Sequence, residues 1–76
     1  MNYFVDEYSK NTIGSWEKRM VNSISGKQSA IDWAVWFIGY RQNVILWIIP
    51  ELKGHKKISL CWFPNGLKIT QHKQEV

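Results

Sequence analysis

The stretch WFIGYRQNVILWIIP, residues 36–50, decides how this chain of 76 residues folds. Two apolar runs flank the polar tripeptide Arg41-Gln42-Asn43. A single membrane-spanning helix is disfavoured here, because an Arg near the centre of a span costs about 2.5–3.5 kcal/mol on insertion scales. Two apolar runs with a polar turn between them indicate two elements of a folded core instead. We therefore expect no membrane span.

The second apolar run begins a series of three predicted strands. VILWII is rich in β-branched residues and stops at Pro50, which cannot donate to a sheet ladder. Further on, KISLCWF and LKITQ flank Asn65-Gly66, a pair that tolerates the positive φ that hairpin turns require. We predict a C-terminal β-hairpin with an Asn-Gly turn, and strands over three ranges: 44–49, 57–63 and 67–71.

The N-terminal third is predicted to contain a helix at about 15–24. Ser15 is a suitable N-cap residue, and three apolar side chains fall at i, i+4 and i+8 on one helical face: Trp16, Met20 and Ile24. Before this helix, the sequence NYFVDEY at residues 2–8 predicts a short strand at the edge of the sheet.

Residues 30–40 fit both a helix and a strand. As a helix, Ser29 and Asp32 have the spacing of a capping box, so Asp32 would cap the helix or pair with Arg41. As a strand, the stretch has the right residue types, and the neighbouring turn slightly favours a hairpin. Either choice gives an α+β fold: a small single domain with an antiparallel meander of three to four strands and one or two helices.

The strand at 44–49 is apolar on both faces, which raises the question of what covers each face. Alternate side chains point in opposite directions, so Trp47 and its neighbours Ile45 and Ile49 face away from Leu46. A domain of this size buries only a little over about 60% of its surface, and five tryptophans need places. Either the N-terminal segment and a second helix close the second face, or some aromatic surface stays open or is closed by another chain, for example in a homodimer.

Residue types for catalysis or metal binding do not occur at useful spacings. His55, Cys61 and His72 match no zinc-ligand pattern, and the carboxylates are scattered and expected to be mostly solvated. We therefore predict no enzyme, no catalytic or metal-binding residue and no cofactor. The single cysteine, expected to be a buried apolar side chain, is typical of a reducing compartment, and the acidic N-terminus is unlike a signal peptide, so we expect a cytoplasmic protein.

Basic residues concentrate in the last third of the chain, which contributes most of the net charge of +4. The loop ELKGHKK should gather its charges at one end of the sheet, near Lys68. Eight of the ten basic residues are lysine, whereas base-specific DNA recognition favours arginine.

These features predict a small binding protein that docks on a larger protein or nucleoprotein and modulates or inhibits it, in the manner of accessory proteins of phages and mobile elements. The alternative is a nonspecific nucleic-acid-binding domain that uses lysines and aromatic rings. A peptide that binds a membrane surface is disfavoured, because no long basic amphipathic helix is predicted. The predicted macromolecule-binding residues are Trp36, Trp62, Lys53, His55, Lys56, Lys57 and Lys68.

Overall fold

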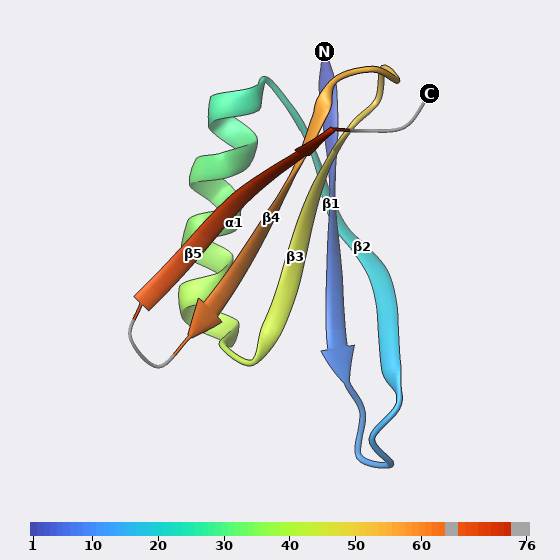
Figure 1. Cartoon of the computed structure of the whole chain (residues 1–76), viewed down its shortest axis with the longest axis vertical. Coiled ribbons are helices and arrows are strands. Elements are labelled where there is room, and N and C mark those ends of the chain that lie inside the picture. The colour runs from blue at the N-terminus through green and yellow to red at the C-terminus, as the bar shows by residue number, and fades with distance from the viewer. Residues whose placement is uncertain (64–65, 74–76) are drawn as a thin grey trace.

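The computed structural model describes residues 1–63 and 66–73, which form one helix and a five-stranded antiparallel sheet (Figure 1). The order of the strands across the sheet is β2-β1-β3-β4-β5, and the helix lies against one face. The predicted α+β single domain is confirmed, with five strands in place of three to four. The elements are β1 (Asn2–Lys10), β2 (Trp16–Ser25), α1 (Lys27–Arg41), β3 (Val44–Pro50), β4 (Lys56–Phe63) and β5 (Gly66–Lys73).

Strands β3, β4 and β5 form a meander in which each strand pairs antiparallel with the next. They occupy the predicted ranges 44–49, 57–63 and 67–71, and each is longer by at least one residue. Ile45 pairs with Cys61, and Cys61 pairs with Lys68 in turn. The predicted Asn-Gly turn includes residue 65, which lies outside the described residues.

The predicted helix at 15–24 is wrong, because these residues form the edge strand β2. The sequence WEKRMV also alternates, so Trp16 and Met20 point to one face of the sheet and Arg19 points to the other. Pairing with β1 provides hydrogen-bond partners for the backbone groups on one side of this strand, and this tertiary pairing overrides the helical spacing. Ser15 caps no helix, since its N–H donates to the side chain of Asn11 in the turn before β2.

Strand β1 is an inner strand, whereas the sequence predicted an edge strand. It pairs with β2 on one side and with β3 on the other. Because both neighbours run antiparallel to β1, β2 and β3 run parallel to each other. A connection between parallel strands must cross one face of the sheet, and a helix is its usual form.

This crossover explains why residues 30–40 are helical and the slightly favoured strand is wrong. Helix α1 packs on the sheet through Ala30, Ala34 and Ile38, which are fully buried at i, i+4 and i+8. The predicted capping box is absent, because the N-cap is Gly26 and no side chain caps the helix. At the other end the chain leaves the helix at Gln42, which has a positive φ of 35°.

The core lies between α1 and the face of the sheet that it covers. Two alanines on the helix allow close approach to the strands, whose buried side chains include Val5, Leu46, Ile48, Ile58 and Leu60. No helix among the described residues is long and apolar enough to cross a membrane.

One acidic side chain joins three elements at the edge of this core. Glu7 on β1 is only 1% exposed, although the sequence suggested a solvated carboxylate. Arg19 on β2 donates from Nε to Glu7 Oε1 at 3.0 Å, and Arg41 Nη2 lies 3.6 Å from Oε2. Arg41 therefore pairs with Glu7 and not with Asp32, which is exposed and accepts a hydrogen bond from Gln28.

Two adjacent isoleucines on β3 allow a comparison of how much each face of the sheet contributes to stability. Ile48 is fully buried under α1, whereas Ile49 is half-buried on the other face. Ile48→Ala should lower the free energy of unfolding by about 2–5 kcal/mol, since it leaves a cavity in the core. Ile49→Ala should cost about 1 kcal/mol. Urea unfolding followed by circular dichroism measures both, and equal costs would contradict this account of the core.

The buried carboxylate gives a second stability prediction. Glu7→Gln removes the charge that both arginines share, and we expect a loss of about 1–3 kcal/mol in the free energy of unfolding. The loss stays below that of a fully buried ion pair because both arginines reach solvent. The control is Glu17→Gln at an exposed position on β2, with an expected change within about 0.5 kcal/mol. If Glu7→Gln leaves the free energy of unfolding unchanged, the ion pairs of Glu7 do not hold the end of the helix in place.

Candidate binding surface

The sheet face opposite α1, here called the open face, is not covered by any described element (Figure 1). The strand register shows which side chains share it: Tyr8 lies opposite Ile45, and Ile45 lies opposite Cys61. Its centre is made of half-buried apolar and aromatic side chains: Phe4, Tyr8, Ile45, Trp47, Ile49 and Cys61. Within this chain no described element closes the second face, so the alternative in which the N-terminal segment and a second helix cover it is not the one that the structure shows.

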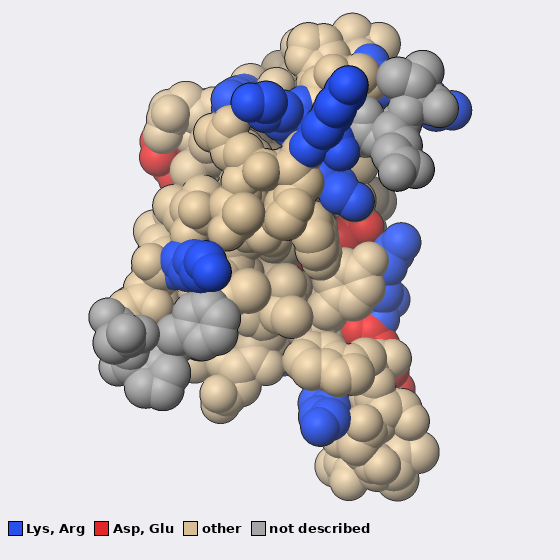
Figure 2. Space-filling model, viewed as in Figure 1, with Lys and Arg blue, Asp and Glu red and all other residues tan. Residues whose placement is uncertain are grey.

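Lysines surround this apolar centre. Figure 2 shows separate groups of basic side chains around a mostly uncharged middle, with few acidic atoms on this side of the molecule. By strand register, four lysines belong to the open face: Lys10, Lys18, Lys57 and Lys68. The acidic residue on the same face is Asp6, which is 6% exposed and lies 3.7 Å from Lys18 Nζ. Among the described residues, the open face therefore carries more positive than negative charge.

Trp47 occupies the middle of the open face and is held by its neighbours. Tyr8 meets it edge-on at 6.5 Å between ring centroids, and the His72 ring lies 5.2 Å away. The ammonium of Lys57 lies over the indole at 4.9 Å from its centroid, which is a cation–π contact. These contacts hold the ring in place, and the ammonium of Lys57 occupies part of one ring face.

Beside Trp47, the Ser59 hydroxyl and His72 Nε2 lie 3.1 Å apart. Ser59 is buried on β4 and His72 is half-buried on β5, so the pair joins two strands. A serine nucleophile would also need a group that orients the histidine and donors for an oxyanion. Among the described residues no carboxylate bonds to His72, and no group of three or more His, Cys, Asp or Glu side chains could hold a metal ion.

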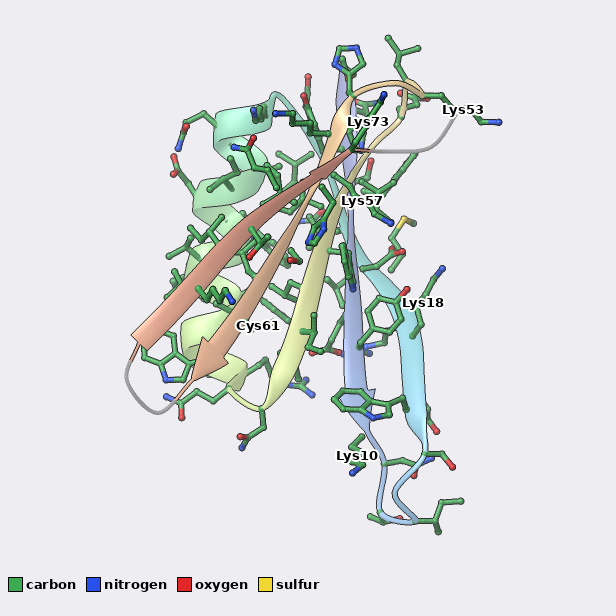
Figure 3. The ribbon with its side chains drawn as sticks, in the orientation of Figure 1. Lys10, Lys18, Lys53, Lys57, Cys61 and Lys73 are labelled. Atoms are coloured by element: carbon green, nitrogen blue, oxygen red, sulfur yellow. The ribbon has the colours of Figure 1, made fainter. Side chains whose placement is uncertain are left out.

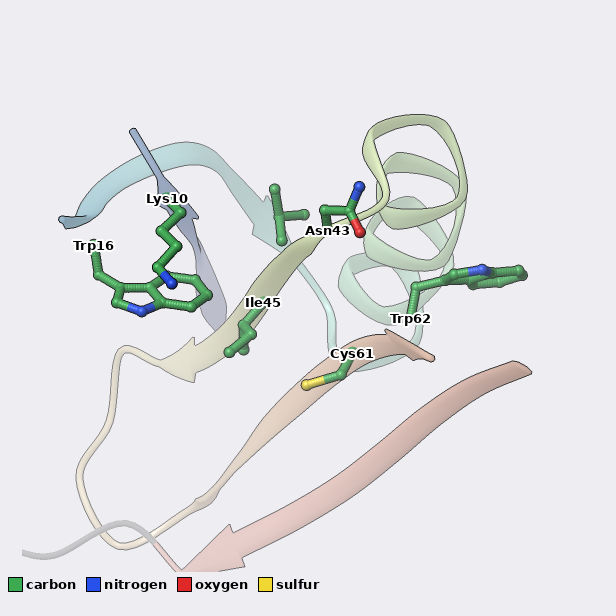
Figure 4. Close-up of a pocket in the computed structure, with 7 residues that line it drawn as sticks. Lys10, Trp16, Asn43, Ile45, Cys61 and Trp62 are labelled. Carbon is green, nitrogen blue, oxygen red and sulfur yellow. The ribbon is translucent and has the colours of Figure 1, made fainter. Parts of the chain in front are cut away.

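A groove of about 370 Å³ lies at the end of the open face where β3 begins (Figure 4). Lys10 and Trp16, which flank the turn between β1 and β2, lie on one side, and Cys61 on β4 lies on the other. Ile45 lies between them. The half-buried Cys61 thiol therefore lines a groove, whereas the sequence suggested a buried apolar side chain.

The predicted basic residues do not all gather at one place. Lys53 and His55 lie in the connection before β4, with Lys56 and Lys57 at the start of that strand. Figure 3 shows Lys53, Lys57 and Lys73 toward one end of the sheet. Lys68 is not at this end, because it pairs with Cys61 further along β4.

The two predicted tryptophans lie on different parts of the molecule. Trp36 is 63% exposed on α1, which lies on the opposite side of the sheet from the open face, and it stacks on Tyr40. Trp62 is 40% exposed near the end of β4 and borders the groove. None of the five tryptophans is fully buried, which agrees with the alternative that some aromatic surface stays open.

Sequence reasoning missed much of the open face. Tyr8, Trp16 and Trp47 were not identified as site residues, and neither were Lys10 and Lys18. The alternation of Trp16, Lys18 and Met20 along β2 was the signal that could have found Trp16 and Lys18. A helical interpretation of residues 15–24 concealed it.

Comparisons of this chain with protein families, with curated proteins and with solved structures find no match.

Proposed function

We propose that this chain is a non-enzymatic binding protein whose open face docks on an acidic surface of a larger protein and modulates or inhibits that protein. One observation carries the proposal: an uncovered sheet face with an apolar centre and a border of lysines. Protein interfaces have the same organisation, with an apolar core inside a polar rim.

The size of the open face fits this role. Five strands about 4.8 Å apart and about eight residues long present a surface of roughly 24 by 27 Å. That area approaches the roughly 800 Å² that each partner contributes to a standard protein–protein interface. The sheet face is therefore large enough to form a specific contact without help from the helix side.

The state of the aromatic rings favours a protein partner over nucleic acid. Bases stack on free ring faces, but Lys57, Tyr8 and His72 already contact the ring of Trp47. Ile45 and Ile49 beside it offer aliphatic surface, which suits the side chains of a protein partner better than bases.

A single-stranded nucleic acid is the second candidate, and one observation favours it. Trp16 is 54% exposed, and the ammonium of Lys10 lies 6.0 Å from its ring centroid. A base stacked on this indole would place its phosphate near the lysine.

Site-specific photo-crosslinking in cells that naturally produce the protein tests the proposal. A benzoylphenylalanine replaces either Met20, which is 60% exposed on the open face, or Tyr40, which is 77% exposed on α1. We expect one protein, identified by mass spectrometry, to crosslink from position 20 and not from position 40. The purified partner should then change its activity when this protein is added.

Charge reversal supplies the matched control. Lys57→Glu on the open face should weaken binding to the purified partner at least about tenfold, because it brings a carboxylate onto the acidic partner. Lys53→Glu makes the same change of charge in the connection before β4 and should alter the affinity less than about threefold. Crosslinks from position 40 alone would overturn the proposal. Recovery of nucleic acid alone, with affinity that falls by orders of magnitude between 50 and 200 mM salt, would replace it with the second candidate.

A further inference from the structure

We infer that the groove beside Lys10 receives a bulky apolar side chain from an acidic segment of the partner protein. This inference rests on the proposed function and names the feature of the partner that the open face recognises. Seven residues border the groove: Lys10, Trp16, Asn43, Val44, Ile45, Cys61 and Trp62 (Figure 4).

The walls of the groove select an apolar group. Trp16, Ile45 and Cys61 present an indole, an aliphatic chain and a thiol toward the same space. Its volume of about 370 Å³ is near the lower end of the range for ligand sites, which is roughly 300–1,000 Å³. A single aromatic or large aliphatic side chain is an occupant of suitable size.

The charge at the groove favours a carboxylate next to the partner's apolar side chain. Of the described residues that line the groove, Lys10 is the one that is charged, and it is exposed. Among the described residues no carboxylate lies within ion-pair distance of its ammonium, in contrast to Lys18, which pairs with Asp6. A carboxylate of the partner could therefore approach Lys10 while the neighbouring apolar side chain enters the groove.

The position of the groove makes it suited to an anchor. Interfaces derive much of their binding energy from a few large side chains that fill well-formed pockets. Ile45 and Cys61 belong both to the groove and to the apolar centre of the open face, so an anchor there would be continuous with the larger contact. The turn between β1 and β2 brings Trp16 beside it and extends the wall.

The Cys61 thiol reports directly on occupancy, because it lines the groove. The probe is an acetylated pentapeptide with a central phenylalanine and two glutamates on each side. At millimolar concentration it should slow alkylation of Cys61 by iodoacetamide and shift the indole N–H resonance of Trp16, which Trp16→Phe assigns. Two control peptides, one with a central alanine and one with lysines in place of glutamates, should do neither.

Two variants separate the charge from the apolar contact. Lys10→Gln should lower the affinity for the probe peptide about two- to fivefold, as expected for loss of one exposed ion pair. Lys53→Gln should leave this affinity unchanged. Cys61→Leu, checked for folding by circular dichroism, should narrow the groove at the position of the thiol, reduce the shift of the Trp16 resonance and weaken binding of the purified partner about tenfold or more.

The outcomes separate the groove from the proposed function. If the partner crosslinks from position 20 but the probe does not protect Cys61, or Cys61→Leu binds the partner normally, the groove inference is overturned and the proposed function stands. If the probe binds in the groove but no protein crosslinks from position 20, the groove binds an acidic peptide, but the proposed function fails and with it the assignment of the groove to a partner protein. Micromolar binding of a free carboxylate such as octanoate would indicate a small-molecule site and overturn the peptide occupant.

Discussion

One helix covers one face of a five-stranded sheet, and the rest of the structure depends on this constraint. Strand β1 pairs with both β2 and β3, so the chain between those two strands must cross the sheet, and α1 makes that crossing. The crossing buries Ala34, Ile38 and the inward side chains of the strands. No second described element is available for the other face, although β3 presents apolar residues there as well.

The two faces of the sheet also differ in how their charges are paired. On the helix side, Glu7 is buried and paired with Arg19 and Arg41, so its charge is matched within the fold. On the open face, four lysines outnumber the one carboxylate that the described residues place there, that of Asp6, so this face carries an excess of positive charge. The same strand β1 thus carries Glu7 into the structural core and Asp6 onto the open face. The modest net charge of +4 is therefore concentrated on the open face, where we propose that the partner binds.

The sequence predicted the strands at 44–49, 57–63 and 67–71 because β-branched runs and turn residues are local signals. It misjudged residues 15–24, since Trp16, Met20 and Ile24 fit a helical face while the same stretch alternates as a strand. Only pairing with β1, a contact distant along the chain, decides between the two. For the same reason the helix at 30–40 and the burial of Glu7 depend on topology that local patterns do not contain. The two-sided apolar pattern of β3 made an open face one of two alternatives, but it did not indicate the lysines on β1 and β2.

Isoleucine methyl NMR with a soluble paramagnetic agent tests the central claim most directly, because Ile48 and Ile49 are adjacent on β3 and point to opposite faces. In the free protein, the agent should broaden the methyl signals of Ile45 and Ile49 more than those of Ile48 and Ile58. When the partner binds, Ile45 and Ile49 should become protected while Ile48 and Ile58 do not change. If Ile45 and Ile49 are as protected as Ile48 in the free monomer, the face is not open and the account is contradicted.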